Sequence, residues 1–141
     1  MDDDVVAFLQ QQRDVALFCR DSAANPLGYP MRTVACNSSE LTFTTYRKSA
    51  KVRHVERDPR VCVLASVESR SDVRWVSLVG RARVVAPSEE ELESLFGASA
   101  SDGRVPTGMG EFVKQRLREG KRILICVDEL RTAGLREGTF K

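Results

Sequence analysis

The chain has 141 residues, of which 42% are hydrophobic and 30% are charged, and its formal net charge is +2. This length favours a single domain over residues 1–141, and the composition excludes a disordered or strongly basic protein. The sequence has no run of the roughly 20 apolar residues that span a membrane, and its start, MDDDVVAFLQ, lacks the basic region of a signal peptide. We therefore expect a cytoplasmic protein without membrane contacts.

The first part of the chain predicts one helix and three strands. Residues 4–12 are amphipathic and open with acidic side chains, which favours a short helix. Residues 14–20, DVALFCR, predict a strand, whereas DSAANPLGYP at 21–30 predicts a turn because Asn-Pro and Gly interrupt both periodicities. Residues 31–37 and 41–45 alternate in polarity around the tight link NSSE, so we expect them to form a hairpin.

The middle of the chain predicts a helix and a long hairpin. The period changes to helical over residues 49–57, until Asp58-Pro59 ends the helix. Residues 60–69 and 73–85 alternate as two antiparallel strands joined by a polar turn. Gly80, inside the second strand, predicts a bend or bulge of the kind that a barrel corner needs.

The last part of the chain predicts two short helices and a closing strand. Carboxylates after Pro87-Ser88 favour a helix at 89–96, a Gly/Ser-rich link predicts a mobile segment at 97–110, and a second helix at 111–119 ends at Gly120. Residues 121–130, KRILICVDEL, predict the final strand, and we expect the tail to continue it along a sheet edge. About six mostly antiparallel strands with short helices predict a mainly β fold, a small β-barrel.

Six basic side chains gather directly behind the strand that ends in Thr44 and Thr45. They are Arg47, Lys48, Lys51, Arg53, Arg57 and Arg60. Taken singly, the four arginines and Lys48 are better interpreted as a solvated face that pairs with Glu56 and Asp58. Ser49 and Lys51 differ, because the start of a helix presents free N–H groups and its dipole disfavours a cation in the first turn. For these two residues we favour an anion site that holds a phosphate.

This region resembles a known family. FTTYRKSAKVRHVERDPRV followed by RWVSLVGRARVV is similar to the pyridoxamine 5'-phosphate oxidase-like, or flavin/deazaflavin oxidoreductase, superfamily of split β-barrels. The pattern of that superfamily is a strand ending in aromatic-x-Thr, then Ser-x-Lys, an Asn/Asp-Pro-Arg stop and a later strand ending in Gly. GKRILICVDELRTAGL is similar to its closing strand.

The resemblance implies a cofactor site and a subunit arrangement. It implies cofactor phosphate near Arg32, Ser49 and Lys51, with Thr44 and Thr45 beside it. It also implies a cofactor contact at Trp75, where the deazaflavin-using branch has a similar Arg-Trp pair. Members are usually homodimers with the cofactor in a groove between the two barrels, so two sites are expected per dimer.

The chain departs from the flavin-binding oxidases of this superfamily at three places. Those enzymes favour Ser-Arg-Lys, whereas Ala50 occupies the middle position here, and Asn37 replaces an expected strand lysine. The substrate segment rich in Arg and Trp is missing from the C-terminus, which is LREGTFK. We therefore expect fewer charged partners for the phosphate, and a reaction other than vitamin B6 oxidation.

The resemblance favours an oxidoreductase that transfers a hydride between a flavin-like cofactor and a small organic substrate. Coenzyme F420 ranks ahead of FMN, because its extended anionic tail would give Arg47, Lys48 and Arg53 partners. The cofactor ring carries the chemistry in such enzymes, so no side chain is assigned as acid or base. Tyr29 and Tyr46 are candidates to line the pocket or to pack against it.

Three other interpretations remain. A protein that binds flavin, F420 or haem without turnover is the alternative, with His54, the single histidine, as the haem ligand; charged neighbours of His54 disfavour haem. A nucleic-acid binder is disfavoured because the chain is nearly neutral and only 6% aromatic. A metal site is not expected, because the four cysteines lack C-x-x-C spacing and predict buried thiols.

Overall fold

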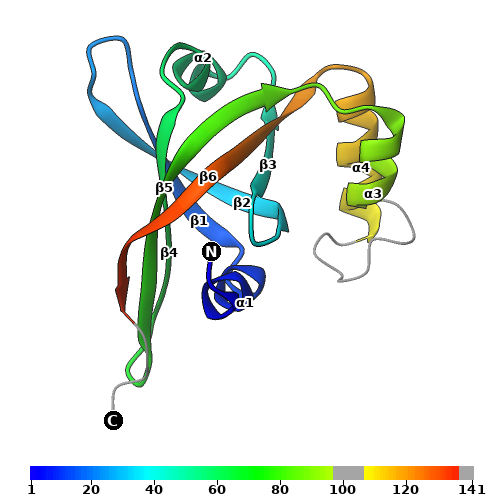
Figure 1. The fold of residues 1–141 in the computed structure, drawn as a ribbon. Coiled ribbons are helices and arrows are strands. Elements are labelled where there is room, and N and C mark those ends of the chain that lie inside the picture. The colour runs from blue at the N-terminus through cyan, green and yellow to red at the C-terminus, as the bar shows by residue number, and fades with distance from the viewer. Residues whose placement is uncertain (97–106, 137–141) are drawn as a thin grey trace.

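The computed structural model describes residues 1–96 and 107–136 of the chain. Its six strands close into one barrel in the order β1-β2-β3-β6-β5-β4, and every neighbouring pair is antiparallel. The mainly β barrel that the sequence predicts is therefore confirmed (Figure 1). The elements in chain order are α1 (Asp3–Gln11), β1 (Asp14–Arg20), β2 (Pro26–Cys36), β3 (Leu41–Tyr46), α2 (Ala50–Arg57), β4 (Arg60–Glu68), β5 (Val73–Val85), α3 (Glu89–Phe96), α4 (Thr107–Arg118) and β6 (Arg122–Arg136).

Alternating side chains of the strands fill the barrel, and helices cover its openings. Leu17, Phe43 and Leu78 are fully buried in the main core. Val5 of α1 and Val55 of α2 belong to the same core, and Figure 1 shows these two helices at opposite ends of the barrel. α3 and α4 pack outside the wall, on a second cluster that includes residues of β2 and β6. This arrangement places α2 directly after the end of β3.

The predicted bend at Gly80 is present in β5. The pairing of β5 with β6 shifts register between Val79 and Arg81. A Cβ atom at Gly80 would lie 2.7 Å from the backbone oxygen of Asp128 and 2.9 Å from a side-chain carbon of Val127. Only glycine lets the two strands approach this closely.

The prediction of a turn throughout residues 21–30 was wrong. Strand β2 begins at Pro26 and pairs with β1 up to Arg32, whereas its pairing with β3 begins only at Thr33. Among the described strands, the proline-containing half of β2 therefore pairs on one side only, which is where a strand tolerates proline. The turn itself is confined to residues 21–25, in which the Asp21 carboxylate accepts hydrogen bonds from the Ala23 and Asn25 N–H groups.

The predicted start of the second C-terminal helix was also wrong. α4 begins at Thr107 rather than Glu111, because its packing beside α3 outweighs the roughly 1 kcal/mol by which each glycine disfavours a helix. Residues 97–106 of the predicted mobile link lie outside the described residues. Gly120, with φ +76°, follows the helix as expected. β6 continues along β5 to Arg136, so the expected continuation of the closing strand is confirmed for these residues.

None of the four cysteines, all of which lie in the described part of the chain, forms a disulfide, and Cys19, Cys36 and Cys126 are buried. Burial raises the pKa of the Cys126 thiol to about 11, so this thiol stays protonated at neutral pH. This environment suits a small apolar side chain rather than a reactive one. Among the helices that the structure describes, none is both long enough and apolar enough to cross a membrane.

Asp58 ties the end of α2 to two strands. Its carboxylate lies 2.6 Å from Arg20 Nη2 of β1 and 3.1 Å from Arg60 Nε of β4. Hydrogen bonds from Arg60, followed by those from Arg20, hold the pKa of Asp58 well below its usual value of 3.8.

Asp58→Asn is therefore expected to lower the free energy of unfolding near neutral pH. Because the folded state holds the pKa low, the stabilisation is fully present above pH 3.8 and is lost as the pH falls further. Denaturant unfolding at several pH values measures it. The wild type and the variant should converge in acid, and a constant difference between them would contradict this role of the carboxylate.

Candidate functional site

The junction of β3 and α2 holds an unpartnered hydroxyl. The Ser49 N–H donates to the Tyr46 carbonyl oxygen at 3.1 Å, which turns the chain into the helix. Ser49 is the N-cap residue of α2, but its side chain makes no capping hydrogen bond. Its Oγ atom is buried and has no hydrogen-bond partner in the described part of the chain. Such a group is uncommon in native proteins, and an oxygen atom of a ligand or of water would satisfy it.

Lys51 lies in the first turn of the same helix. Its ammonium group is half-buried and lies 5.4 Å from the centre of the Tyr29 ring. Burial, followed by the positive charge of Arg122, lowers the pKa of Lys51 from its usual value. No carboxylate of residues 1–96 or 107–136 forms an ion pair with it. A cation in the first helical turn is therefore held without a counter-charge.

Arg122 supplies a second cation at this junction. It begins β6 and pairs in register with Tyr46 at the end of β3. Its Nε donates to Thr44 Oγ1 at 3.2 Å, an Nη donates to the Thr44 carbonyl oxygen at 3.4 Å, and its guanidinium lies 4.5 Å from the centre of the Tyr46 ring. Among the described residues no carboxylate pairs with it either. We refer to Ser49, Lys51 and Arg122 as the anion cluster.

Arg122 was not predicted as a site residue. A usable signal existed, because the strand LTFTTY and the closing strand KRILICVDEL were both predicted. An antiparallel pair of them brings the first residue of the closing strand beside the end of the other. The sequence did not show that β3 and β6 pair, because these strands are far apart in the sequence although they are adjacent in the barrel.

The other predicted residues at this junction have different environments. Thr44 contacts Arg122, whereas Thr45 is only 3% exposed and, as the next residue of the strand, points to the opposite side. Arg47 and Lys48 are exposed on the turn. The Arg47 N–H donates to the Lys121 carbonyl oxygen at 3.0 Å, and the Lys48 carbonyl oxygen accepts from Arg53 at 3.1 Å. Both side chains therefore face solvent on the turn that leads into α2.

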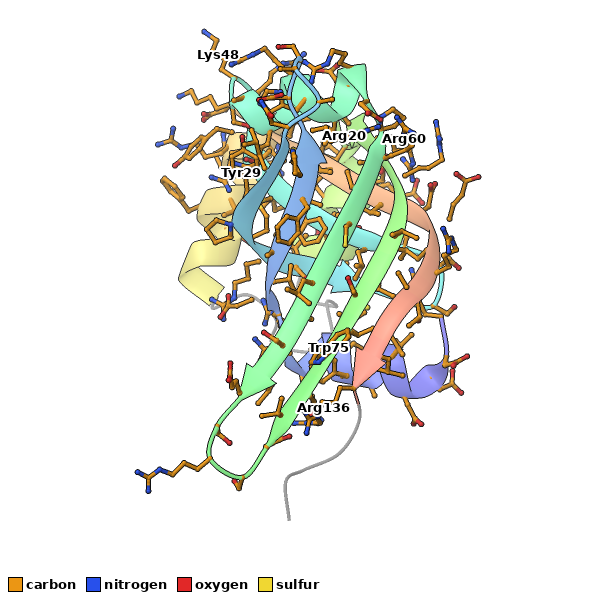
Figure 2. The ribbon with its side chains drawn as sticks, turned by 90° about the vertical axis from the view of Figure 1, so that its left-hand side faces the viewer. Arg20, Tyr29, Lys48, Arg60, Trp75 and Arg136 are labelled. Carbon is orange, nitrogen blue, oxygen red and sulfur yellow. The ribbon has the colours of Figure 1, made fainter. Side chains whose placement is uncertain are left out.

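The two remaining predicted residues are Arg32 and Trp75. The Arg32 side chain is 58% exposed and its Nε lies 3.6 Å from the Asp14 carboxylate. Trp75 lies towards the end of the barrel opposite to α2, near Arg136, whereas Tyr29 and Lys48 lie at the α2 end (Figure 2). Trp75 lines a small groove of about 190 Å³ together with Phe8 and Leu135. One copy of the chain therefore does not bring Trp75 to the anion cluster.

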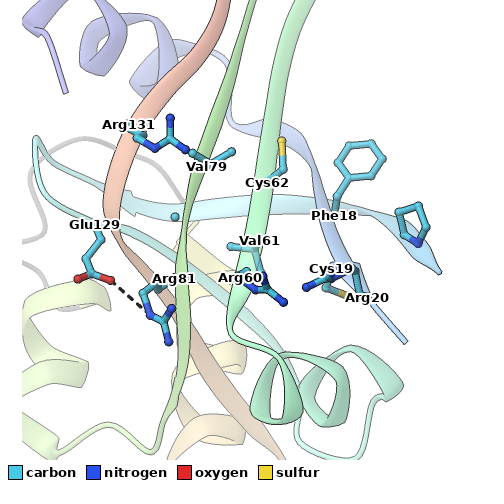
Figure 3. A pocket seen from close by; sticks show the side chains of 12 residues that line it. Phe18, Cys19, Arg20, Arg60, Val61, Cys62, Val79, Arg81, Glu129 and Arg131 are labelled. Carbon is cyan, nitrogen blue, oxygen red and sulfur yellow. Dashed lines mark ion pairs between the residues drawn. The ribbon is translucent and has the colours of Figure 1, made fainter. Parts of the chain in front are cut away.

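A wider groove of about 540 Å³ lies on the outer wall of the barrel. Phe18, Cys62 and Val79 form an apolar part of its lining, and arginines such as Arg81 stand at its margin (Figure 3). Arg81 Nε lies 3.4 Å from a Glu129 carboxylate oxygen. None of the predicted site residues lines this groove.

The sequence also matches a family along most of its length. Residues 1–132 match the family described as pyridoxamine 5'-phosphate oxidase. The chain belongs to the pyridoxamine 5'-phosphate oxidase family. No curated protein matches it in sequence.

Solved structures of similar proteins share the fold. The conserved hypothetical protein Rv2991 of Mycobacterium tuberculosis has a TM-score of 0.71 at 21% identity, over 100% of this chain and 85% of that one. The heme storage protein HutZ of Vibrio cholerae has a TM-score of 0.69 at 14% identity, over 97% and 91%. A structure named F420 reductase has a TM-score of 0.60 at 15% identity, over 92% and 94%. At these identities the likeness concerns the fold alone.

The anion cluster fits the phosphate of a family cofactor. A phosphate oxygen can accept from the unpartnered Ser49 hydroxyl and from the free N–H groups at the start of α2. Lys51 offers a point charge, and the planar guanidinium of Arg122 offers a pair of donors. A single phosphate would therefore satisfy a buried hydroxyl and two uncompensated cations together.

Proposed function

We propose that the protein is an oxidoreductase that binds F420 or FMN and transfers a hydride between this cofactor and a small organic substrate, with F420 ranking ahead. The observation that carries the proposal is the anion cluster, in which a buried hydroxyl has no hydrogen-bond partner and two cations have no acidic partner among the described residues. Membership of the pyridoxamine 5'-phosphate oxidase family and the likeness to an F420 reductase support it.

In this proposal Ser49, Lys51 and Arg122 hold the cofactor phosphate, and Thr44 orients Arg122. Arg47 and Lys48 lie on the solvent side, where they would meet the further negative charges of an F420 tail. The bound ring supplies the hydride chemistry. The part of the protein is to fix the ring through its phosphate and to exclude water around it.

We further propose that the protein is a cytoplasmic homodimer and that Trp75 reaches the anion cluster of the partner subunit. Within one chain, Lys51 lies beside Tyr29 at the α2 end of the barrel, whereas Trp75 lies towards the opposite end (Figure 2). On the outer wall of β1, β4 and β5, the half-buried apolar side chains Phe18, Leu64 and Val79 lie at nearby register positions. Such a group of apolar side chains on a small domain favours contact with another protein. Two copies packed there in opposite directions would bring Trp75 of one beside Lys51 of the other.

Mixed dimers test this arrangement. Lys51→Ala and Trp75→Ala should each weaken cofactor binding, but a mixture of the two variants should recover tight binding at up to one site per mixed dimer. The reason is that one of its two sites combines the intact Lys51 of one copy with the intact Trp75 of the other. Fluorescence titration before and after subunit exchange measures it, with sedimentation velocity to confirm the dimer. A mixture as weak as its components would contradict a shared site.

A cofactor carrier without turnover is the second candidate. The fold likeness to a heme storage protein favours it, and His54 is half-buried with its Nδ1 buried and unpartnered among the described residues. His54 lies on α2 between the exposed Arg53 and the buried Val55. Because one neighbour is charged, its surroundings suit haem less well than the anion cluster suits phosphate.

Titration of the purified protein with F420, FMN and haem in parallel tests the proposed function. We expect F420 or FMN to bind most tightly and the bound cofactor to exchange a hydride with a reductant. Preferential binding of haem, with a shift of its Soret band that His54→Ala abolishes, would overturn the oxidoreductase in favour of the carrier.

A further inference from the structure

Ala50, the residue directly after Ser49, reduces the positive charge available to balance a phosphate at the start of α2. Family members with Ser-Arg-Lys place two cations directly after the serine, whereas here Ala50 and Lys51 follow Ser49, so only one of these two positions carries a charge. An alanine at the first helical position cannot contribute a charge or a side-chain donor. The local sequence would therefore supply one cation where such members supply two.

The structure brings a second cation to the same place from a distant part of the chain. Arg122 is 71 positions beyond Lys51 (122 − 51), yet it lies at the β3 end because β6 pairs with β3 there. Thr44 holds the guanidinium by two hydrogen bonds and Tyr46 lies against its face. Both hydrogen bonds use the Nε and one Nη, so the other Nη is left for a ligand.

The orientation of Arg122 is fixed without a carboxylate. Several other arginines form ion pairs with carboxylates, as Arg20 does with Asp58 and Arg83 does with Glu40. Arg122 instead contacts a hydroxyl, a carbonyl oxygen and an aromatic ring, none of which carries a negative charge. A half-buried guanidinium that is held in place and still charged is prepared to bind an anion.

We propose that Arg122 is the second phosphate-binding cation of the site and replaces, from β6, the arginine that Ser-Arg-Lys members carry on the helix. The phosphate would lie between Lys51 and Arg122 and accept from Ser49 Oγ. This inference rests on the proposed cofactor site but names a residue that neither the family pattern nor the local sequence assigns. Arg122 binds and positions the cofactor through its phosphate.

The first test needs no ligand. Because the charge of Arg122 contributes to the lowered pKa of Lys51, Arg122→Met should raise the pKa of the Lys51 ammonium, followed by NMR of selectively labelled lysine side chains. Methionine keeps an unbranched stem against Tyr46. Arg122→Lys should leave the pKa low. A Lys51 pKa that is identical in all three proteins would overturn the proximity on which the inference depends.

The second test measures cofactor affinity. Arg122→Met should weaken binding of FMN and F420 by about 10-fold or more, as expected for a lost charge-assisted hydrogen bond, and should leave the weaker binding of riboflavin, which has no phosphate, unchanged. Arg116→Met is the matched control, because Arg116 also lies over an aromatic ring, 4.7 Å from the centre of Phe112. It should not change any of the affinities.

A rescue variant separates this inference from the proposed function. Ala50→Arg added to Arg122→Met should restore much of the lost affinity, because it returns a cation to the helix. If Lys51→Ala weakens FMN and F420 but Arg122→Met does not, the cofactor site stands and the role of Arg122 is refuted. If neither variant changes the affinities, the proposed site itself is wrong. If Arg122→Met weakens riboflavin as much as FMN, Arg122 acts through the fold and the inference is also refuted.

Discussion

Gly80→Val is expected to lower the free energy of unfolding by about 3 kcal/mol or more, at the upper end of the range for an overpacked position. Even the first added carbon would lie 2.7 Å from the Asp128 backbone oxygen and 2.9 Å from Val127. A backbone atom in the middle of a paired strand cannot move aside as the tip of a long side chain can. The variant would therefore have to break the pairing of β5 and β6 at the barrel corner.

Guanidinium denaturation at a fixed protein concentration measures this loss. Arg81→Val is the matched control, because it adds a valine at the next position of the same strand, where the side chain is 54% exposed and makes an ion pair with Glu129. The control should lose no more than about 1 kcal/mol, the value of an exposed ion pair. Equal midpoints for Gly80→Val and the wild type would refute the assignment of Gly80 to the corner.

Lys51→Met is expected to weaken FMN and F420 binding by about 10- to 100-fold, the value of one hydrogen bond to a charged group. The unliganded protein should nevertheless be at least as stable as the wild type. The folded state lowers the pKa of Lys51, so the charged ammonium is less favourable there than in the unfolded chain, and removing it removes a penalty. A residue that binds ligand at the expense of stability is typical of functional sites.

Denaturation across a pH series checks the sign of this effect. The penalty exists while Lys51 is charged and disappears as the pH rises through the lowered pKa towards 10.5. The stability advantage of Lys51→Met should therefore shrink in the same direction. A variant that is less stable at neutral pH and binds FMN and F420 normally would show that Lys51 is a structural residue.

The sequence predicted those parts of the fold that depend on local patterns. Alternation identified β1 and the long pair β4–β5, and the Asp58-Pro59 stop ended α2 at the expected place. Gly80 was recognised because a glycine inside a regular strand needs a geometric reason. These elements follow from periodicity and from single residues with restricted backbones.

The features that were missed depend on neighbours in space. Pro26 and Pro30 normally argue against a strand, and they are tolerated in β2 because, among the described strands, its first half pairs on one side only. Arg122 becomes part of the candidate site only because β6 pairs with β3. Trp75 and Lys51 are likewise separated because the start of β5 and the start of α2 lie at opposite ends of the closed barrel. Composition and motif spacing do not specify this arrangement.

We propose that the β3–α2 junction binds a phosphate through the anion cluster. The most direct measurement compares the affinity of the wild type for FMN with that for riboflavin, and for F420 with that for its phosphate-free deazaflavin core. Two charged contacts predict a preference of about 100-fold or more for the phosphate-bearing member of at least one pair, and Lys51→Met should reduce this preference. Equal affinities within both pairs would show that the anion cluster does not bind the cofactor phosphate.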